Sequence, residues 1–321
     1  MSLARATAPE GVPPLPPGPP YAASELMDWR GLRFNLPPGD ERLPALADGG
    51  VEPSAPLANL AGAHAAWATW AEGMDFLDPQ SPVADLKALE QALYLHHWAP
   101  WLGAVASPRP PRVLDLGGGI GRFTMPCLDA GWDVELVDPD LESLRRAVWH
   151  AAGRLGRLDV SWTTGERLPE GPAFDLVFAV EVFCYVEEPH AVLARVLSRL
   201  RPGGHVLFSV EARHGWAACG DAAPGTLEAF LDDQPVYAPG DRFVRTYTAD
   251  DIHQLFVGGA GSGRRGAIEA LLPTHYVLSG PFEAAAGPVD LPRLLDLEAR
   301  LRGHRIAAPL NRAWTGVVRY D

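Results

Sequence analysis

Apolar runs and helix-like segments alternate through the middle of this 321-residue chain. Four apolar runs predict buried strands, at residues 113–116, 132–138, 174–180 and 200–210. Helices are predicted between them, at residues 122–130, 141–155 and 190–200. Because strands that alternate with helices form a parallel sheet covered on both faces, residues 106–211 predict a doubly wound α/β core.

The two flanks of this core differ from it in pattern. Residues 1–20 are rich in Pro, Gly and Ala, which predicts a disordered tail. Residues 21–105 predict a loop and then two aromatic-rich helices, at 60–73 and 83–101. Residues 212–250 are irregular, and Thr248 predicts a helix start. Further elements are predicted as strands at 275–278 and 315–320 and a helix at 291–302.

The end of the first core strand carries a glycine turn. Asp115 is followed by glycine at positions 117, 119 and 121, and a helix-like stretch begins at Arg122. Glycines let the backbone turn sharply and approach a ligand closely, and the start of a helix offers free N–H groups. A dinucleotide frame, G-x-G-x-x-G, would need glycine where Arg122 or Thr124 stands. The spacing therefore disfavours a nicotinamide dehydrogenase.

The glycine pattern resembles motif I of the class I S-adenosylmethionine-dependent methyltransferases, and later segments extend the resemblance. The next strand ends on Asp138, residues 163–169 resemble the adenine-binding segment, and residues 200–204 match the L-x-P-G-G turn. Tyr185 stands where the family's E-V-L-E-H-V motif has His, and Thr164 stands where the adenine segment has Asp. The resemblance implies a Rossmann-like, seven-stranded, mostly parallel sheet with a terminal antiparallel strand and an N-terminal helical lid.

The resemblance also implies which residues bind the cofactor, S-adenosyl-L-methionine. Asp115 would hold the methionine ammonium, and Asp138 would accept hydrogen bonds from both ribose hydroxyls. The complete set implied is Asp115, Gly117, Gly119, Gly121, Asp138, Pro139, Gly165, Glu166 and Glu181. By the same resemblance, residues 21–105 would supply the lid and residues 212–321 a substrate-binding insertion and the strands that complete the sheet.

Methyl transfer needs a base only when the acceptor carries a removable proton. His97 and His214 are predicted as possible bases, and Tyr185 as a group that orients the acceptor. Glu211 and His96 are further candidates near the same end of the sheet. The sequence has no His, Asp or Glu cluster with metal-ligand spacing, so no metal site is predicted.

Charge and composition limit the partners. The formal net charge is −13 and the isoelectric point is about 5.2, which argues against nucleic acid and anionic membranes. Apolar runs are too short to span a membrane, and three widely spaced cysteines predict neither disulfides nor zinc. We therefore expect a cytoplasmic protein, either a monomer or a homodimer.

The function predicted from the sequence is methyl transfer to a small molecule, a metabolite or natural product, by in-line displacement with release of S-adenosylhomocysteine. The aromatic flanks favour a small-molecule pocket. Alternatives are a methyltransferase that acts on a peptide or protein, aminopropyl transfer on the same fold, and a non-catalytic regulator that binds the cofactor.

Overall fold

The computed structural model describes a core and most of the C-terminal half of the chain. The described residues are 33–34, 75–79, 81, 83–105, 109–186, 188–219, 227–232, 236–238, 242–258 and 261–321. The tail predicted at 1–20 and the helix predicted at 60–73 lie outside these residues.

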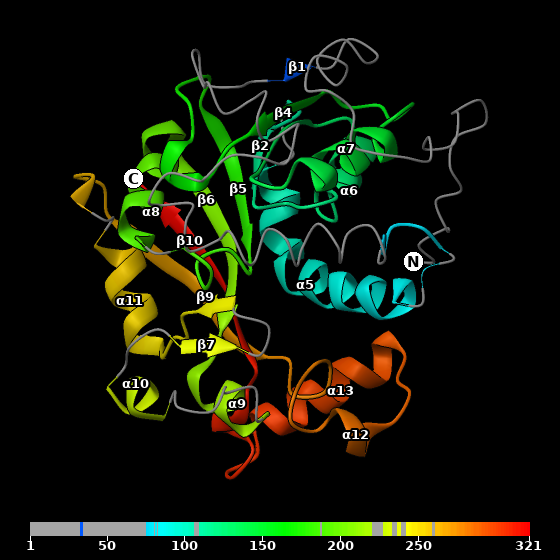
Figure 1. The fold of residues 1–321 in the computed structure, drawn as a ribbon, viewed down its shortest axis with the longest axis vertical. Coiled ribbons are helices and arrows are strands. Elements are labelled where there is room, and N and C mark those ends of the chain that lie inside the picture. Colours follow the sequence, from blue (N-terminus) through cyan, green and yellow to red (C-terminus); the bar gives the residue numbers. More distant parts are fainter. Residues whose placement is uncertain are drawn as a thin grey trace.

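One mixed sheet organises the fold, with strand order β1-β4-β3-β2-β5-β6-β10-β9 (Figure 1). Neighbours from β4 to β6 are parallel, whereas β10 is antiparallel to both β6 and β9. Seven strands are β2 (Arg112–Leu116), β3 (Asp133–Asp138), β4 (Leu158–Trp162), β5 (Phe174–Val180), β6 (Leu200–Glu211), β9 (Gly266–Thr274) and β10 (Ala313–Tyr320). The predicted doubly wound sheet with these seven strands is confirmed, and the two-residue strand β1 (Arg33–Phe34) adds an eighth strand at the edge by pairing with β4.

Helices cover both faces of the sheet because the strands carry apolar side chains on both sides. In β2, Leu114 and Leu116 pack into one hydrophobic cluster and Val113 packs into another. The first cluster includes side chains of α8 (Pro189–Arg199) and α11 (Ala249–Val257). The second includes side chains of α5 (Ala84–Val105), α6 (Thr124–Asp129) and α7 (Leu141–His150). Figure 1 shows α8 and α11 on one side of the strands and α6 and α7 on the other.

Helix α5 is fixed to the sheet by aromatic packing. Tyr94 and Trp98 are almost fully buried, and their ring centroids lie 5.2 Å apart. Trp98 packs on Phe123 at 5.6 Å, and Phe123 packs on Phe178 of β5 at 5.4 Å. These two aromatics of the predicted helix 83–101 therefore belong to the core, as large apolar rings at helical spacing usually do.

The C-terminal third follows the predictions in part. The helix start at Thr248 is confirmed, because Thr248 and Asp251 form a capping box at the start of α11. The predicted helix 291–302 is confirmed as α13 (Leu291–Arg302). The strand predicted at 275–278 is wrong, because β9 ends at Thr274 and His275 turns into the left-handed region at φ 61°. Tyr276, Val277 and Leu278 instead fill a hydrophobic cluster with Leu294 of α13.

Two other segments differ from what the sequence pattern predicted. Helix α7 ends at His150 rather than near residue 155, because Gly153 adopts φ 78° and breaks the helix. The irregular stretch after β6 holds short elements, namely α9 (Arg213–Ala218), α10 (Leu227–Leu231), β7 (Val236–Ala238) and β8 (Arg242–Val244). Strands β7 and β8 form an antiparallel pair outside the main sheet. The remaining helix, α12 (Glu283–Ala286), lies just before α13.

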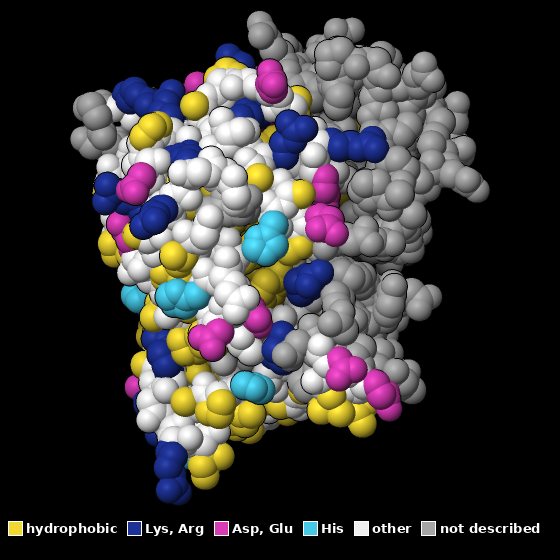
Figure 2. Space-filling view, turned by 90° about the vertical axis from the view of Figure 1, so that its left-hand side faces the viewer, with side chains coloured by type: hydrophobic (Ala, Val, Ile, Leu, Met, Phe, Trp, Pro, Cys, Tyr) yellow, Lys and Arg dark blue, Asp and Glu magenta, His cyan; other side chains and the backbone are white. Residues whose placement is uncertain are grey.

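The outer surface is mixed in charge. On the face that carries α8 and α11, acidic side chains lie among the basic ones (Figure 2). This face is therefore not a continuous basic surface. Among the described helices, none combines the length and the apolar composition that a membrane crossing requires.

A buried ion pair ties α8 to the sheet. The guanidinium of Arg199 donates to Glu135 of β3 over 2.7 and 3.0 Å and lies over the ring of Phe174 at 4.3 Å. Both charged side chains are at most 5% exposed. Arg112 also contacts Glu135, at 3.2 Å. Because a buried charge is costly without a partner, this pair constrains how α8 docks on the strands.

We expect Arg199→Met to lower the free energy of unfolding by about 2–4 kcal/mol, because Glu135 would lose its main partner inside the fold. Arg112 would remain beside Glu135 and would keep the loss from being larger. Urea unfolding measures the change, and Arg195→Met, at an exposed position on the same helix, is the matched control. Equal midpoints for the two variants would contradict a stabilising role for the pair.

Candidate functional site

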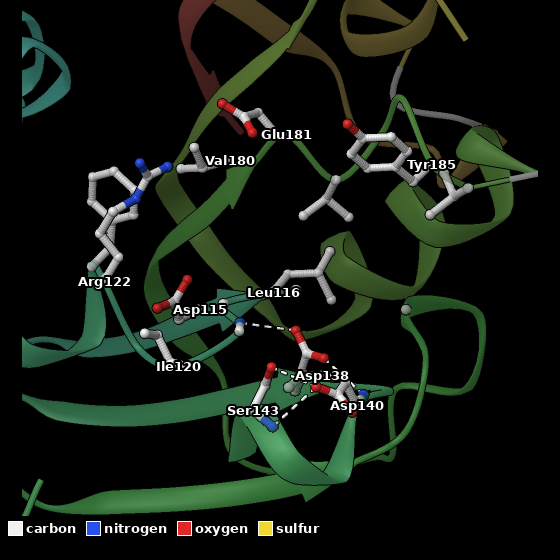
Figure 3. A pocket seen from close by; sticks show the side chains of 18 of the residues that line it. Asp115, Leu116, Ile120, Arg122, Asp138, Asp140, Ser143, Val180, Glu181 and Tyr185 are labelled. Carbon is white, nitrogen blue, oxygen red and sulfur yellow. Dashed lines mark hydrogen bonds between the residues drawn. The ribbon is translucent and has the colours of Figure 1, made fainter. Parts of the chain in front are cut away.

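A cavity of about 550 Å³ lies at the carboxyl ends of β2, β3, β5 and β6. This is the edge at which doubly wound sheets bind ligands. Figure 3 shows Asp138, Asp140 and Ser143 at one end of the cavity and Glu181 and Tyr185 at the other. The residues at the two ends differ in chemistry.

The glycine turn after β2 forms the floor of the cavity. Gly117 and Gly121 have φ angles of 62° and 91°, which L side chains rarely adopt. A Cβ atom on Gly117 would lie 2.6 Å from the side chain of Val182, and one on Gly121 would lie 2.5 Å from Met125. The turn can therefore pass under the cavity only because these positions carry no side chain.

Two buried carboxylates frame this turn. Asp115 is 1% exposed and accepts a hydrogen bond of 2.7 Å from the hydroxyl of Thr124. Asp138 accepts backbone N–H groups of Gly119 and Asp140, each at 2.8 Å. Burial raises the pKa of Asp115 to about 6. Burial and the neighbouring Asp140 raise the pKa of Asp138 to about 7. Each carboxylate oxygen keeps capacity for a second hydrogen bond, so both groups can receive donors from a ligand.

The segment after β4 presents buried oxygens that lack partners. Thr164 Oγ1, Thr163 Oγ1 and Glu166 Oε2 are buried in the cavity wall and make no hydrogen bond with a described residue. Gly165 lies among them, at the start of the short 3-10 helix η2 (Gly165–Arg167). Buried polar atoms are normally satisfied, so this cluster fits a ligand with polar groups of its own. Pro139 also lines this end.

The other end of the cavity carries an ionic cluster. Glu90 of α5 pairs with Arg122, which follows the glycine turn, and with Lys87, at 2.9 Å. Burial acts to raise the pKa of Glu90, but Arg122, His275 and Lys87 outweigh it and hold that pKa well below its ordinary range. The sequence analysis did not identify this cluster. The position of Arg122 directly after the glycines was its only sequence signal.

Three residues of this end have strained backbones. Glu181, His275 and Ser279 have φ angles of 59°, 61° and 51°, and they are the non-glycine residues with positive φ among those described. All three line the cavity. The backbone N–H of Glu181 donates to the Ser209 carbonyl at 3.0 Å, which helps to hold it there. Strain of this kind concentrates at functional sites, so this end of the cavity is a candidate functional site.

The predicted catalytic residues divide between different places. Tyr185, which was predicted to orient the acceptor, lines the cavity. His97 does not line it. Burial, Arg302, His96 and His275 together lower the pKa of His97 to about 4. His214 is exposed and lines a second cavity, of about 310 Å³, beside the start of α11.

The remaining candidates are similarly divided. Glu211 lines the main cavity and pairs with Arg312, whereas His96 is exposed on α5. No group of three or more His, Cys, Asp or Glu in the described part of the chain is placed to hold a metal ion. Sequence reasoning missed His275 because it placed this residue inside a strand.

Comparison with known proteins gives a family match. Residues 89–259 match a family model described as a methyltransferase domain, and the match covers more than half of the chain. It begins in α5 and ends just after α11, so it includes the glycine turn, Asp138 and most of the cavity wall.

Curated relatives match a smaller part. A ubiquinone biosynthesis O-methyltransferase of Bradyrhizobium sp. (strain ORS 278) is 34% identical over 103 residues, which are 32% of this chain and 41% of the relative. One from Paramagnetospirillum magneticum is 30% identical over 134 residues, which are 40% of this chain and 54% of the relative. The chain thus spans about half, or less, of the length of these relatives.

Solved structures support the fold. The magnesium protoporphyrin IX methyltransferase of Synechocystis PCC 6803, crystallised with bound S-adenosylhomocysteine, superposes with a TM-score of 0.50. The alignment covers 80% of this chain and 98% of that one, at 15% identity. At this level of identity the likeness shows a shared fold.

The raised pKa of Asp115 predicts a pH-dependent stability. Its contribution to folding is complete below its ordinary pKa of 3.8 and is lost as the pH rises through about 6. We expect the advantage of the wild type over Asp115→Asn to shrink by on the order of 2 kcal/mol between pH 4 and pH 7. Urea unfolding without ligand measures this, with the exposed Asp296→Asn as control. A difference that stays constant with pH would contradict the assignment.

Proposed function

We propose that this chain, which belongs to the methyltransferase domain family, transfers a methyl group from S-adenosylmethionine to a small molecule. One observation carries the proposal. The glycine turn places the buried carboxylates of Asp115 and Asp138 on the same cavity as the strained residue Glu181. One end of the cavity thus has the groups that a nucleoside ligand needs, and the other has groups for an acceptor.

The residues present fit the cofactor. Asp138 would accept the ribose hydroxyls, and such donors would offset the cost of burying its charge. The unpartnered oxygens of Thr164 and Glu166 would accept from the adenine amino group or other ligand donors. Thr164 would thereby replace the Asp that the family pattern has at this position.

The remaining cofactor contacts are proposed from the same cavity. Asp115 would hold the methionine ammonium. Burial destabilises the charged form of the Asp115 carboxylate, and a bound cation would offset that cost. The turn of Gly117, Gly119 and Gly121 would let the backbone approach the ligand, while Pro139 and Gly165 line the adenine end. Glu181 lies at the opposite end of the cavity from Asp138 (Figure 3) and would be a further cofactor contact.

The bound cofactor supplies a sulfonium methyl with an already activated leaving group. The chain's own residues then have to position the acceptor in line with that methyl and exclude water. Tyr185, Val182 and Phe76 line the wall and can do both. Positioning in an enclosed site accounts for much of the acceleration in such displacements.

The size of the cavity supports a small-molecule acceptor. About 550 Å³ is within the usual range for small-ligand pockets and would be shared between cofactor and acceptor. The curated relatives are named for the biosynthesis of ubiquinone, a small molecule. The formal charge of −13 fits an acceptor other than nucleic acid, and we propose a monomer or homodimer in the cytoplasm.

Cofactor binding tests the site. We expect Asp138→Ala to weaken binding of S-adenosylhomocysteine by about 1.5–3 kcal/mol, about tenfold or more, because the ligand would lose hydrogen bonds to a charged group. Isothermal titration calorimetry measures this, with Asp296→Ala on the exposed face of α13 as control. NAD should not bind comparably. Unchanged affinity in Asp138→Ala would place the ribose elsewhere.

Turnover separates the alternatives. With methyl-labelled cofactor and a host metabolite extract, we expect the label in a product of low molecular mass. Label that appears in the protein fraction would favour a peptide or protein acceptor. Normal cofactor binding with no labelled product would favour a non-catalytic regulator.

A further inference from the structure

Glu181 is held in a strained conformation at the end of β5, beside the glycine turn. It has a φ of 59°, and a non-glycine residue persists in this region only where its surroundings impose it. The next residue, Val182, has a methyl group 2.6 Å from where a Cβ of Gly117 would be, so this loop abuts the turn. β5 also pairs directly with β2, the strand that leads into the turn. The fold therefore fixes Glu181 next to the floor of the cavity.

The backbone of Glu181 is clamped on both sides. Its N–H donates to the carbonyl oxygen and to the hydroxyl oxygen of Ser209, at 3.0 and 3.1 Å. Its carbonyl accepts from the thiol of Cys184 at 3.1 Å. Ser209 belongs to β6, which lies beside β5 in the sheet, and Cys184 belongs to the loop after β5. Contacts from two segments thus impose the left-handed conformation.

The side chain of Glu181 is positioned from α5. The hydroxyl of Tyr94 lies 3.3 Å from Oε1 of Glu181 and 3.1 Å from the hydroxyl oxygen of Ser209. Burial, Glu181 and Glu90 raise the pKa of Tyr94 well above its ordinary value, so this hydroxyl keeps its proton and acts as a donor. The ring of Tyr94 is fully buried and stacks on Trp98, with 5.2 Å between the centroids. Tyr94 therefore brings a rigidly held donor to one oxygen of Glu181.

The negative charge of Glu181 lacks an adjacent cation. Among the described residues that line the cavity, three carry Lys or Arg side chains, and each is paired with another glutamate. These pairs are Lys87 and Arg122 with Glu90, and Arg312 with Glu211. In the described part of the chain, Glu181 forms no direct ion pair, and its carboxylate bonds to the neutral hydroxyl of Tyr94. Arg122 and Arg312 act on it electrostatically from farther away.

We propose that Glu181 faces the sulfonium of the bound cofactor and that Tyr94 holds it there, so that the two residues increase the preference for the methylated cofactor over the demethylated product. The inference rests on the proposed methyltransferase function and assigns a residue to the charged centre of its cofactor. S-adenosylmethionine and S-adenosylhomocysteine differ by one methyl group and by the positive charge on sulfur. A carboxylate without an adjacent cation attracts the charged sulfur and has no such interaction with the neutral one.

This placement follows from the contacts proposed for the rest of the cofactor. With the ribose at Asp138 and the ammonium at Asp115, the sulfur joins these two parts and must lie between them, over the glycine turn. Glu181 lies across the cavity from Asp138 (Figure 3), at the end of the strand that pairs with β2. Its carboxylate is therefore the acid at this end that is available to a cation over the turn.

The contact acts on exchange of the cofactor rather than on the chemical step. When the methyl group leaves, the sulfur becomes neutral and its attraction to Glu181 ends. A product held by the remaining contacts alone dissociates more readily, which favours its replacement by fresh cofactor. Tyr94 is a positioning residue, because it contacts Glu181 rather than the ligand.

Binding of the two cofactor forms to the whole chain tests the role of Glu181. In Glu181→Gln, which removes the charge and keeps the shape, we expect affinity for S-adenosylmethionine to fall about tenfold, within the range of one charge pair near a protein surface. Affinity for S-adenosylhomocysteine should change by less than about twofold. Isothermal titration calorimetry measures both without an acceptor or turnover. Equal losses for the two ligands would overturn the inference and place Glu181 against a group that both share, such as the ammonium.

A double-mutant cycle tests the role of Tyr94. Tyr94→Phe removes the hydroxyl and keeps the ring, so we expect a loss of about threefold toward S-adenosylmethionine and none toward S-adenosylhomocysteine. The same substitution made in Glu181→Gln should add no further loss, because the two residues act through one contact. Tyr320→Phe is the matched control, because Tyr320 also buries a hydroxyl, which donates to the Phe256 carbonyl at 2.8 Å, but does not line the cavity. Additive losses, or the same loss in the control, would overturn the positioning role.

The outcomes distinguish this inference from the proposed function. If wild type binds both ligands and Glu181→Gln changes neither affinity, the inference fails and the methyltransferase function stands. If wild type binds neither ligand, both fail.

Discussion

The left-handed glycine turn between β2 and α6 is the constraint on which the site depends. It allows the chain to leave a buried strand and start a helix while its backbone remains open to a ligand. A side-chain methyl of Val182 lies only 2.6 Å from where a Cβ of Gly117 would be, so the turn also sets how closely the loop after β5 approaches. The N–H of Gly119 donates to Asp138, which connects the ends of β2 and β3. One backbone turn thus aligns three strand ends around one cavity.

Electrostatics divides this cavity into two parts. At the glycine turn, Asp115 and Asp138 are buried with few compensating charges, and burial raises both pKa values. These groups gain from a ligand that brings donors or a positive charge. At the other end, Glu90 is equally buried but is surrounded by cations, which lower its pKa. Its ionic state is therefore set by the protein rather than by a ligand.

Elements outside the nucleotide-binding half complete the site. α5 brings Glu90, the end of β9 brings His275, and the start of β10 lies beside Arg312. The matches to curated relatives cover 32% and 40% of this chain. The end of the cavity that holds Glu90 and His275 depends on the packing of these flanking elements on the sheet.

The sequence by itself determined the class of sheet, doubly wound and mostly parallel, and the glycine turn with Asp115 and Asp138. These features follow from local patterns, because apolar runs set strands, and motif residues lie close to the strand ends that carry them. The tertiary structure alone decided which residues meet at the other end of the cavity, where Glu90, Tyr185 and His275 lie. His97 lies on the same helix face as Glu90 but seven residues later, which places it about 10 Å further along α5 and away from the cavity. His275 reaches the wall because contacts from distant segments impose a left-handed turn, and no local pattern encodes such contacts.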